Sequence, residues 1–583
     1  MELALAHQLT PLAVLLPLGI AFLLLAASHW LPPRTADVTA LVVALGLIVL
    51  CGWLALESLH GPIVHWFGGW TPPISGKPDV VLGIAFSVDP ASAAVAAFCA
   101  LLFAGSFVFC WGYFDKVHAH FHVLMLLFLA AMIGFCLTRD LFNLFVWFEL
   151  MGIAAFALTA YPLGKSSLEG AFNFTITNAL GSFLMLAGVG LLYARTGTLD
   201  FVTMGRIIAS VPPDPVVAGG FCLVATALLT KAAIVPFHMW LSDAHAVAPS
   251  PVSVIFSGVM VSLGLFGLLK LIAIVFAGDA QVMMLVHVGL FWLGVATAVV
   301  GGLMAWAQRH LKRLLAFSTI SHLGIMLIAV ASISAIGTEG FLVYLVGHGL
   351  VKGTLFMIAG ILLARFNSVD ELELYGEGRS IWPAGIAMGV AGLLLGGLPW
   401  GLLHDATDAV HAGNHGLAGV VAIIVGTALT GAAVLRATGR IFLRWSGVPS
   451  VELVSPTERE REKGDRPLWL MLLPCVMMLA IALLPTDLAE SFVHRAATGL
   501  VAHVTTHEGG GTLAAAITFA LTILIPAASL LRRRPTSRIA RRAAEVETAP
   551  FYALHVLHSG RVTDYVVWMM VGLAVLAGWL RFG

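Results

Sequence analysis

The fold of this chain is decided by residues 221–245, FCLVATALLTKAAIVPFHMWLSDAH. Apolar and small residues lie on both sides of Lys231, which is typical of a membrane helix that carries one charge inside it. Pro236 follows shortly after, lacks a backbone N–H donor, and is expected to interrupt the helix within the membrane. A charge in such a place is costly, so Lys231 is a candidate functional group.

The composition extends this interpretation to the whole chain. Of the 583 residues, 59% are hydrophobic and 11% are charged, and the mean hydropathy is +0.97. Soluble proteins carry about 25% charged residues, so this chain cannot cover itself with a polar surface. The formal net charge is zero (31 basic and 31 acidic residues), which argues against a nucleic-acid partner.

Apolar runs of about 20 residues recur to the end and predict an all-α integral membrane protein with about 16 transmembrane helices. The predicted segments are 10–31, 37–56, 83–112, 118–138, 141–161, 168–194, 216–240, 250–277, 283–306, 311–334, 339–365, 380–410, 416–444, 468–486, 511–531 and 563–581. We divide the chain into N-terminal helices (1–112), a first unit of helices 4–8 (113–280), a second unit of helices 9–13 (281–445), and C-terminal helices with a basic loop (446–583).

The connecting loops predict the orientation. Loops that follow odd-numbered segments hold most of the basic residues, among them Lys116, Arg309, Lys312, Arg313 and the cluster within 532–542. The positive-inside rule therefore places these loops in the cytoplasm and the N-terminus outside, in the plasma (inner) membrane.

The sequence offers no sign of a cofactor. The cysteines lie in apolar segments without a CxxC pair and are expected to be small buried hydrophobic residues: Cys51, Cys99, Cys110, Cys136, Cys222 and Cys475. There is no P-loop, no GxGxxG motif after a strand, and no zinc spacing. We therefore predict no cofactor, no metal and no active site within the chain itself.

A second intramembrane charge is Glu149, within LFNLFVWFELMGIAAFALTAY (141–161). Glu149 and Lys231 are natural partners if their helices meet, and a Lys–Glu pair that opens and closes could load and release a proton. The alternative is a static ion pair that fixes the packing of the two helices.

A second interrupted helix is predicted within LLLGGLPWGLLHDATDAVH (393–411), around two glycines and Pro399. Two broken helices in corresponding positions of two halves indicate an inverted-repeat transporter with sites near the midplane. Helices 4–8 and 9–13 would form the two five-helix units.

Further titratable residues lie in predicted membrane segments. His348 and Lys352 are four residues apart and share one helix face, and His322 lies on the preceding helix. Histidine titrates near neutral pH and can relay protons, although single membrane histidines are more often packing residues. Lys270 ends segment 250–277 and is expected to extend to the membrane interface. The remaining candidates are His245, His404, Asp405, Asp408 and His411.

Four stretches together resemble one family. They are residues 141–161, TKAAIVPFHMWLSDAHAVAPSPVSVIFSG (230–258), HLKRLLAFSTISHLGIM (310–326) and GHGLVKGTLFMIAG (347–360). The chain is similar, over roughly residues 80–440, to the proton-conducting, antiporter-like membrane subunits. Respiratory complex I, multi-subunit Na+/H+ antiporters and membrane-bound hydrogenases, including formate hydrogenlyases, share these subunits. The tail LHSGRVTDYVVWMMVGLAVLAG (557–578) resembles the ending of hydrogenase-associated members.

The resemblance implies a fourteen-helix core of two inverted five-helix repeats around a hydrated polar axis. It implies that Glu149 pairs with Lys231, and that His322, His348 and Lys352 lie on or near the axis. The sequence departs from the family pattern at two positions. Ser262 in SGVMVSLG (257–264) stands where a lysine is usual, and Thr407 stands where the second broken helix carries a charge. Asp405 or Asp408 could substitute after a small shift.

Two functional hypotheses follow. In the first, the chain is a proton- or cation-translocating subunit whose transport is coupled to redox chemistry or Na+/H+ exchange in other subunits. Its partners would be the bilayer, other membrane subunits and peripheral redox subunits, as in quinone-oxidoreductase-like or hydrogenase-like complexes. In the second, motivated by Ser262, it is a coupling subunit of an ion-gradient-driven uptake system such as inorganic-carbon transport.

Overall fold

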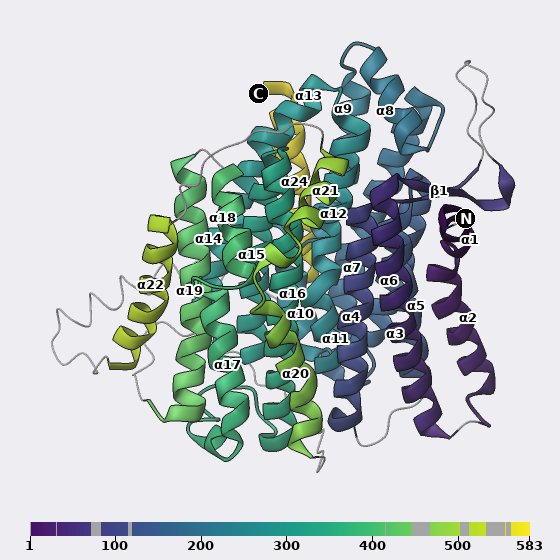
Figure 1. The fold of residues 1–583 in the computed structure, drawn as a ribbon. Coiled ribbons are helices and arrows are strands. Elements are labelled where there is room, and N and C mark those ends of the chain that lie inside the picture. The colour runs from purple at the N-terminus through teal and green to yellow at the C-terminus, as the bar shows by residue number, and fades with distance from the viewer. Residues whose placement is uncertain are drawn as a thin grey trace.

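The computed structural model describes residues 2–30, 32–70, 83–114, 119–413, 416–445, 467–501, 512–531, 554 and 561–582. Over these residues the chain is a bundle of long helices with one small β-hairpin (Figure 1). The hairpin pairs β1 (Ile63–Trp66) with β2 (Ala85–Val88) in antiparallel register, with Ile63 opposite Val88.

The helices of the first half are α1 (Glu2–Leu9), α2 (Leu12–Ala27), α3 (Pro33–Glu57), α4 (Pro90–Tyr113), α5 (Ala119–Leu137), α6 (Leu141–Thr159), α7 (Lys165–Thr196), α8 (Phe201–Ser210), α9 (Pro215–Lys231), α10 (Met239–Val247), α11 (Ser250–Ile255), α12 (Val261–Leu271) and α13 (Ala280–Met284). Those of the second half are α14 (Phe291–Ala307), α15 (Leu311–Ala331), α16 (Ala335–Phe366), α17 (Trp382–Leu395), α18 (Leu402–Gly413), α19 (Leu417–Leu443), α20 (Leu468–Ala482), α21 (Glu490–Leu500), α22 (Thr512–Leu531) and α24 (Val562–Phe582). π-helical turns at Phe256–Met260, Ile272–Phe276 and Leu285–Leu290 continue α11, α12 and α13 without a break.

The all-α membrane architecture is confirmed. Fourteen helices in the described ranges are long and apolar enough to cross a membrane. Each of the predicted segments contains a helix, and three apolar helices are shorter: α9 and α20, which lie in predicted segments, and α8, which does not. The hairpin, α8 and α21 were not predicted, because they are short elements between the apolar runs. All six cysteines are buried and free, as expected.

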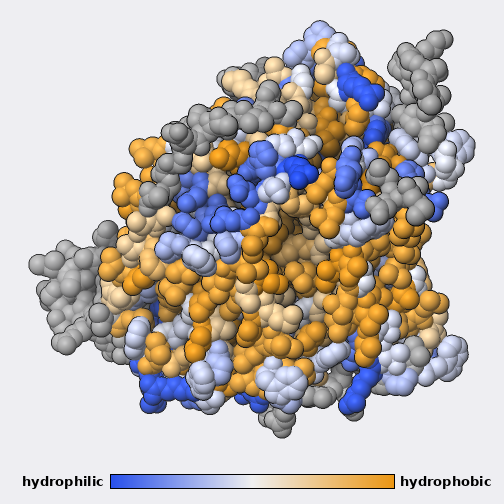
Figure 2. Space-filling model, in the orientation of Figure 1, coloured by the Kyte–Doolittle hydropathy of each residue, from blue (hydrophilic) through white to orange (hydrophobic). Residues whose placement is uncertain are grey.

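The outer surface of the bundle is apolar where lipid would touch it. Figure 2 shows a broad hydrophobic region over the sides of the molecule, with hydrophilic residues gathered mainly toward its two ends. Large apolar side chains such as Val49, Phe183 and Leu524 are 72%, 70% and 62% exposed. A water-soluble protein rarely exposes so much apolar surface, whereas a bilayer requires it.

Both predicted interruptions are present. Helix α9 ends at Lys231 and α10 begins at Met239, and α17 ends at Leu395 before α18 begins at Leu402. In the second interruption Gly397 and Gly401 have φ angles of 84° and 89°, a backbone region in which a residue with a Cβ would be strained.

One polar clamp occurs twice in the chain. Arg139 binds Asp200 at 2.6 Å, and Arg309 binds Asp370 at 3.0 Å, so each residue of the second pair follows its counterpart by 170 positions (139 to 309, 200 to 370). The backbone repeats the pattern as well: Leu141 N donates to Leu199 O, and Leu311 N donates to Val369 O. The clamp joins the start of α6 to the end of α7, and the start of α15 to the end of α16.

A buried cation supports each clamp. Lys270, expected at the interface, is instead buried at 3% exposure and donates to the Cys136 and Thr138 carbonyls at 2.7 and 3.1 Å. Arg436 donates to the carbonyls of Trp306 and Gln308 at 2.5 and 2.6 Å. Its acceptors are again 170 residues after the first pair (136 to 306, 138 to 308). The expectation for Lys270 was wrong because the carbonyls at the end of α5 need a donor inside the protein.

Candidate functional site

Glu149 lies in the middle of α6 and is half-buried in the isolated chain. Its Oε1 accepts a hydrogen bond from the hydroxyl of Ser182 on α7. The Ser182 hydroxyl also lies 3.1 Å from the carbonyl of Asn178 on its own helix. The carboxylate is therefore held by a hydroxyl that has a second acceptor within reach, which lets the hydrogen bond be exchanged at little cost.

Lys231 points from the end of α9 toward the same face of α6. Its Nζ lies 4.3 Å from the ring centre of Phe148, and a Cβ on Gly152 would lie 3.5 Å from it. Gly152 is three residues after Glu149 and shares its helix face. The two opposite charges attract each other, while Nζ has no hydrogen-bond partner among the described residues. The Lys231 side chain therefore reaches the face of α6 that carries Glu149, and the pairing of these two residues stays a prediction.

The interruption after Lys231 is held by hydrogen bonds from the protein. Ala233 N donates to Thr230 O at 3.0 Å, and Val235 N donates to the hydroxyl of Thr297 on α14 at 3.1 Å. The indole of Trp240 donates to Thr230 O at 2.9 Å. A broken helix survives at membrane depth only when its freed backbone groups are satisfied in this way.

The middle of the molecule holds His245 and several hydroxyls. His245 is fully buried and stacks on Phe356 with ring centres 4.5 Å apart. It also interacts electrostatically with the Lys352 ammonium. Ser262 is also fully buried, and its Oγ has no hydrogen-bond partner in the described part of the chain. A hydroxyl so placed can bind water but cannot carry the positive charge of a lysine.

The second half supplies a cluster of polar side chains. Lys352 donates to the Ser318 hydroxyl and to Leu315 O. The rings of His348 and His322 are 5.4 Å apart. Each His322 nitrogen has a partner: the Tyr344 hydroxyl at 2.7 Å and the Thr430 hydroxyl at 2.9 Å. The structure therefore brings His322, His348 and Lys352 together, as the sequence indicated.

The residues of α18 divide into two groups. Thr407 lies close to the Tyr344 hydroxyl, and its own hydroxyl donates to Leu403 O within α18 at 2.7 Å. Asp405 faces elsewhere and accepts from the backbone N and the hydroxyl of Thr486, at 2.9 and 2.8 Å. Because the Asp405 carboxylate is engaged by Thr486, its substitution for the missing charge stays a prediction. Asp408 lies 3.6 Å from His404 in a half-buried pair.

Residues 138–431 match the family model described as the transmembrane part of NADH:quinone oxidoreductase and Mrp antiporter subunits. The chain belongs to this family. It is 32% identical over 360 residues to NADH-quinone oxidoreductase subunit N of Desulforudis audaxviator, a match that covers 60% of this chain and 69% of the relative.

Two solved structures have a fold similar to that of this chain. One is the Mrp complex from Dietzia sp. DQ12-45-1b, with a TM-score of 0.72 and 23% identity over 89% of this chain and 99% of that chain. The other is the archaeal membrane-bound sulfane sulfur reductase, with a TM-score of 0.74 and 22% identity over 88% of this chain and 100% of that chain. At these identities the likeness shows the fold alone.

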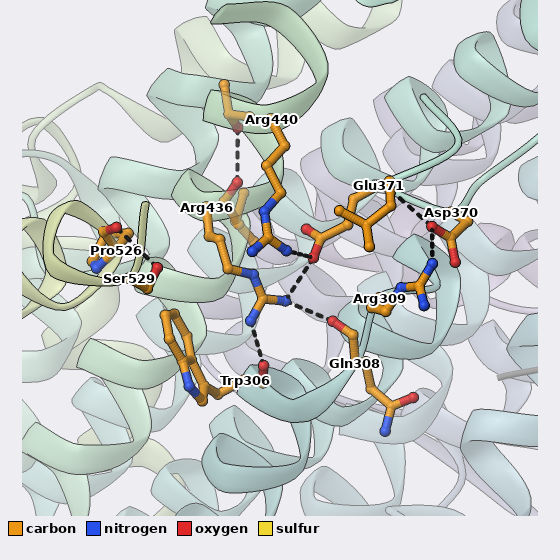
Figure 3. A network of polar contacts seen from close by, with 12 residues as sticks. Trp306, Gln308, Arg309, Asp370, Glu371, Arg436, Arg440, Pro526 and Ser529 are labelled. Carbon is orange, nitrogen blue, oxygen red and sulfur yellow. Dashed lines mark hydrogen bonds and ion pairs between the residues drawn. The ribbon is translucent and has the colours of Figure 1, made fainter. Parts of the chain in front are cut away.

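A buried charge network was not predicted from the sequence (Figure 3). Glu371 lies between two guanidinium groups, 2.6 Å from Arg440 and 3.2 Å from Arg436, and all three side chains are at most 2% exposed. It adjoins the Arg309–Asp370 clamp through the consecutive residues Asp370 and Glu371. The available signal was the four-residue spacing of the two arginines in an apolar segment, which puts them on one helix face.

Hydroxyl residues were missed as well. Ser182, Ser318, Tyr344 and Thr430 each contact a titratable residue, and Ser257 lies 2.5 Å from Thr319 between the two halves. Tyr344 could have been found, because residues 344, 348 and 352 repeat at four-residue spacing on one face of α16. The others carry no signal, since serine and threonine often bond to their own helix backbone.

Proposed function

We propose that the chain is a cation-translocating subunit of a multi-subunit membrane complex and that protons move along the polar groups just described. The route begins at Glu149 and Lys231 and continues through His245 to Lys352, His348 and His322. Tyr344 and Thr407 complete it, with His404 and Asp408 at the outer end of α18. The observation that carries the proposal is the Lys231 ammonium, buried at 1% exposure beside a helix break and facing the helix of Glu149.

The chemistry follows from the positions of these charges. An ammonium in a low-dielectric interior attracts a carboxylate strongly, so movement of a proton onto or off Lys231 changes how firmly it holds Glu149. In the second half, Lys352 is another buried ammonium, which donates to Ser318 and lies near two imidazoles. A change of charge at one group therefore alters the proton affinity of the next, which is how coupled sites titrate.

The duplicated clamp supports the two-unit division, with helices 4–8 in 113–280 and helices 9–13 in 281–445. Five crossings lie between the two clamps: α6, α7, the broken helix α9–α10, the helix Ser250–Phe276 and the helix Ala280–Ala307. An odd number of crossings puts the clamps on opposite faces, which is the relation expected of inverted repeats.

The basic loops support an orientation with the N-terminus outside in the inner (plasma) membrane. The driving force would come from partner subunits, through redox chemistry or Na+/H+ exchange, because the family is named for NADH:quinone oxidoreductase and the Mrp antiporter and the relative for a quinone oxidoreductase. These names do not favour the alternative, inorganic-carbon uptake, which rested on Ser262 alone.

The test uses the complex purified from its native membrane with this chain tagged. Mass spectrometry of the co-purifying chains shows whether redox subunits are present, and proton movement is then measured in proteoliposomes with the appropriate driving reaction. We expect Glu149→Gln and Lys231→Ala to abolish coupled proton movement while the complex still assembles. The exposed residues Glu169 and Lys165 give matched controls, Glu169→Gln and Lys165→Ala. Full pumping in both site variants would overturn the proposal.

A further inference from the structure

The C-terminal helix α24 lies against the break in the first broken helix. In Figure 1 it is the yellow helix that runs among the teal helices of the middle of the chain. A Cβ placed on Gly572 would lie 2.4 Å from the Phe237 ring and 2.8 Å from Pro236. The backbone of α24 therefore packs directly on the residues that interrupt the helix after Lys231, and only a glycine allows so close an approach.

A small cavity remains at this contact. Its volume is about 120 Å³, and its lining includes Val235 and Pro236 from the break, Met304 from α14, and Trp568 from α24. Helix α24 thus closes this side of the break. The backbone N–H of Val235 inside the break donates its hydrogen bond to Thr297 on α14. Loss of α24 would expose irregular backbone to lipid or water, which the membrane interior does not tolerate.

A polar contact fixes α24 in place. The hydroxyl of Tyr565 donates to Oδ2 of Asp243 on α10 at 2.6 Å, and the Tyr565 side chain is buried. The other carboxylate oxygen of Asp243 lies 3.4 Å from Arg313 at the start of α15. A short hydrogen bond to a carboxylate is among the stronger kinds, so one phenol joins α24 to the broken helix and to the second half of the chain.

We propose that α24 is a lateral seal over the break after Lys231 and that Tyr565 is the positioning residue that latches it through Asp243. The seal keeps water and ions that reach Lys231 from escaping sideways through the cavity at Val235. The inference rests on the proposed transport function for its purpose, but the seal itself is a physical property that can be measured without transport.

The first readout is water access to the break in the purified full complex. Val235→Cys places a thiol at the cavity, and the native cysteines of this chain are buried, so its background labelling by a water-soluble maleimide is low when this chain is separated from the other subunits before readout. We expect Tyr565→Phe to speed labelling on the order of tenfold, because the open state gains population when one buried hydrogen bond is lost. Tyr375→Phe is the matched control, because it removes another phenol hydrogen bond of 2.6 Å, to Arg444 O.

A second variant tests the packing without touching the hydrogen bond. Gly572→Leu would push α24 away from Phe237, whereas a Cβ on Gly578 of the same helix meets nothing within 4 Å. Gly572→Leu is expected to speed labelling and Gly578→Leu to leave it unchanged.

The second readout is passive proton leak in de-energised proteoliposomes, to which coupled transport does not contribute. Faster labelling together with a larger leak in both site variants supports the seal. Labelling or leak equal to that of the two controls overturns it. A wild-type complex that moves no protons when driven would defeat the proposed function, yet both of these readouts would still decide the seal.

Discussion

Lys270 and Arg436 cap corresponding helix ends in the two halves of the chain. Lys270 donates to the last carbonyls of α5, and Arg436 donates to the carbonyls at the end of α14 that lie 170 residues further on. The two cations differ in chemistry but meet the same need, since carbonyls at a helix end have no partner within their own helix. These caps are structural features outside the proposed transport route.

The caps predict how their removal acts. Lys270→Met deletes two hydrogen bonds from a buried ammonium and should lower the free energy of unfolding by about 2 kcal/mol. Lys270→Arg should keep most of the stability, because the second half already uses a guanidinium for this purpose. Thermal unfolding of the purified complex measures both, with Lys165→Met at an exposed lysine as the control. An unchanged melting temperature for Lys270→Met would show that the end of α5 needs no cap.

The network around Glu371 predicts which of its substitutions lowers the free energy of unfolding most. Glu371→Gln leaves Arg436 and Arg440 without the carboxylate between them and should cost roughly 3–5 kcal/mol, the usual effect of leaving a buried charge uncompensated. Arg440→Gln should cost less, because Glu371 keeps Arg436 at 3.2 Å. The control is Glu373→Gln, at an exposed position in the same loop, where about 0.5 kcal/mol or less is expected. Melting curves that reverse the order of the two buried variants would contradict this account.

Much of this structure was predictable from apolar periodicity and from charged residues that lie within apolar segments. The membrane segments, both interruptions, and the grouping of His322 with His348 and Lys352 all follow from the length of apolar runs and from four-residue spacing. Such signals are strong because the bilayer allows few alternatives to a helix. The pairing of Glu149 with Lys231 was proposed from the two intramembrane charges, and the family resemblance implied it as well.

The remainder depended on contacts between distant segments. Asp405 and Thr407 are two residues apart, yet the first binds Thr486 and the second meets Tyr344, because the rotation of α18 about its axis decides which of them faces inward. Lys270 was misjudged for a similar reason, since its acceptors come from the end of α5, more than 130 positions earlier in the sequence. Sequence spacing cannot reveal such partners without the fold.

The Tyr344 hydroxyl is predicted to be needed for transport and not for assembly. It hydrogen-bonds His322 at 2.7 Å and lies close to Thr407, so Tyr344→Phe would remove a hydroxyl that stands between the histidine pair and α18. We expect coupled proton movement to fall at least about tenfold, as when a positioned proton-transfer group is lost. The yield of assembled complex should not change. Tyr193→Phe, at an exposed tyrosine, is the control, and normal pumping by Tyr344→Phe would remove Tyr344 from the route.

A pH dependence of stability is expected from Asp140, which lies outside the membrane-spanning helices. Burial raises the pKa of this carboxyl from its ordinary value of 3.8 to about 6, against the opposing effect of backbone N–H groups at the start of α6. Because the folded-state pKa is the higher one, the folded state favours the protonated acid. The resulting stabilisation is complete below about pH 4 and is lost as the pH rises through about 6.

Asp140→Asn isolates this effect, since asparagine caps a helix about as well as aspartate and does not ionise. The variant and the wild type should be similarly stable near pH 4. As the pH rises to 7, the variant should become more stable than the wild type, by up to about 2–3 kcal/mol in the free energy of unfolding for a pKa shift of this size. Melting temperatures of both complexes across this range give the measurement. A stability difference that stays constant with pH would mean that Asp140 ionises in the folded protein as easily as in the unfolded chain.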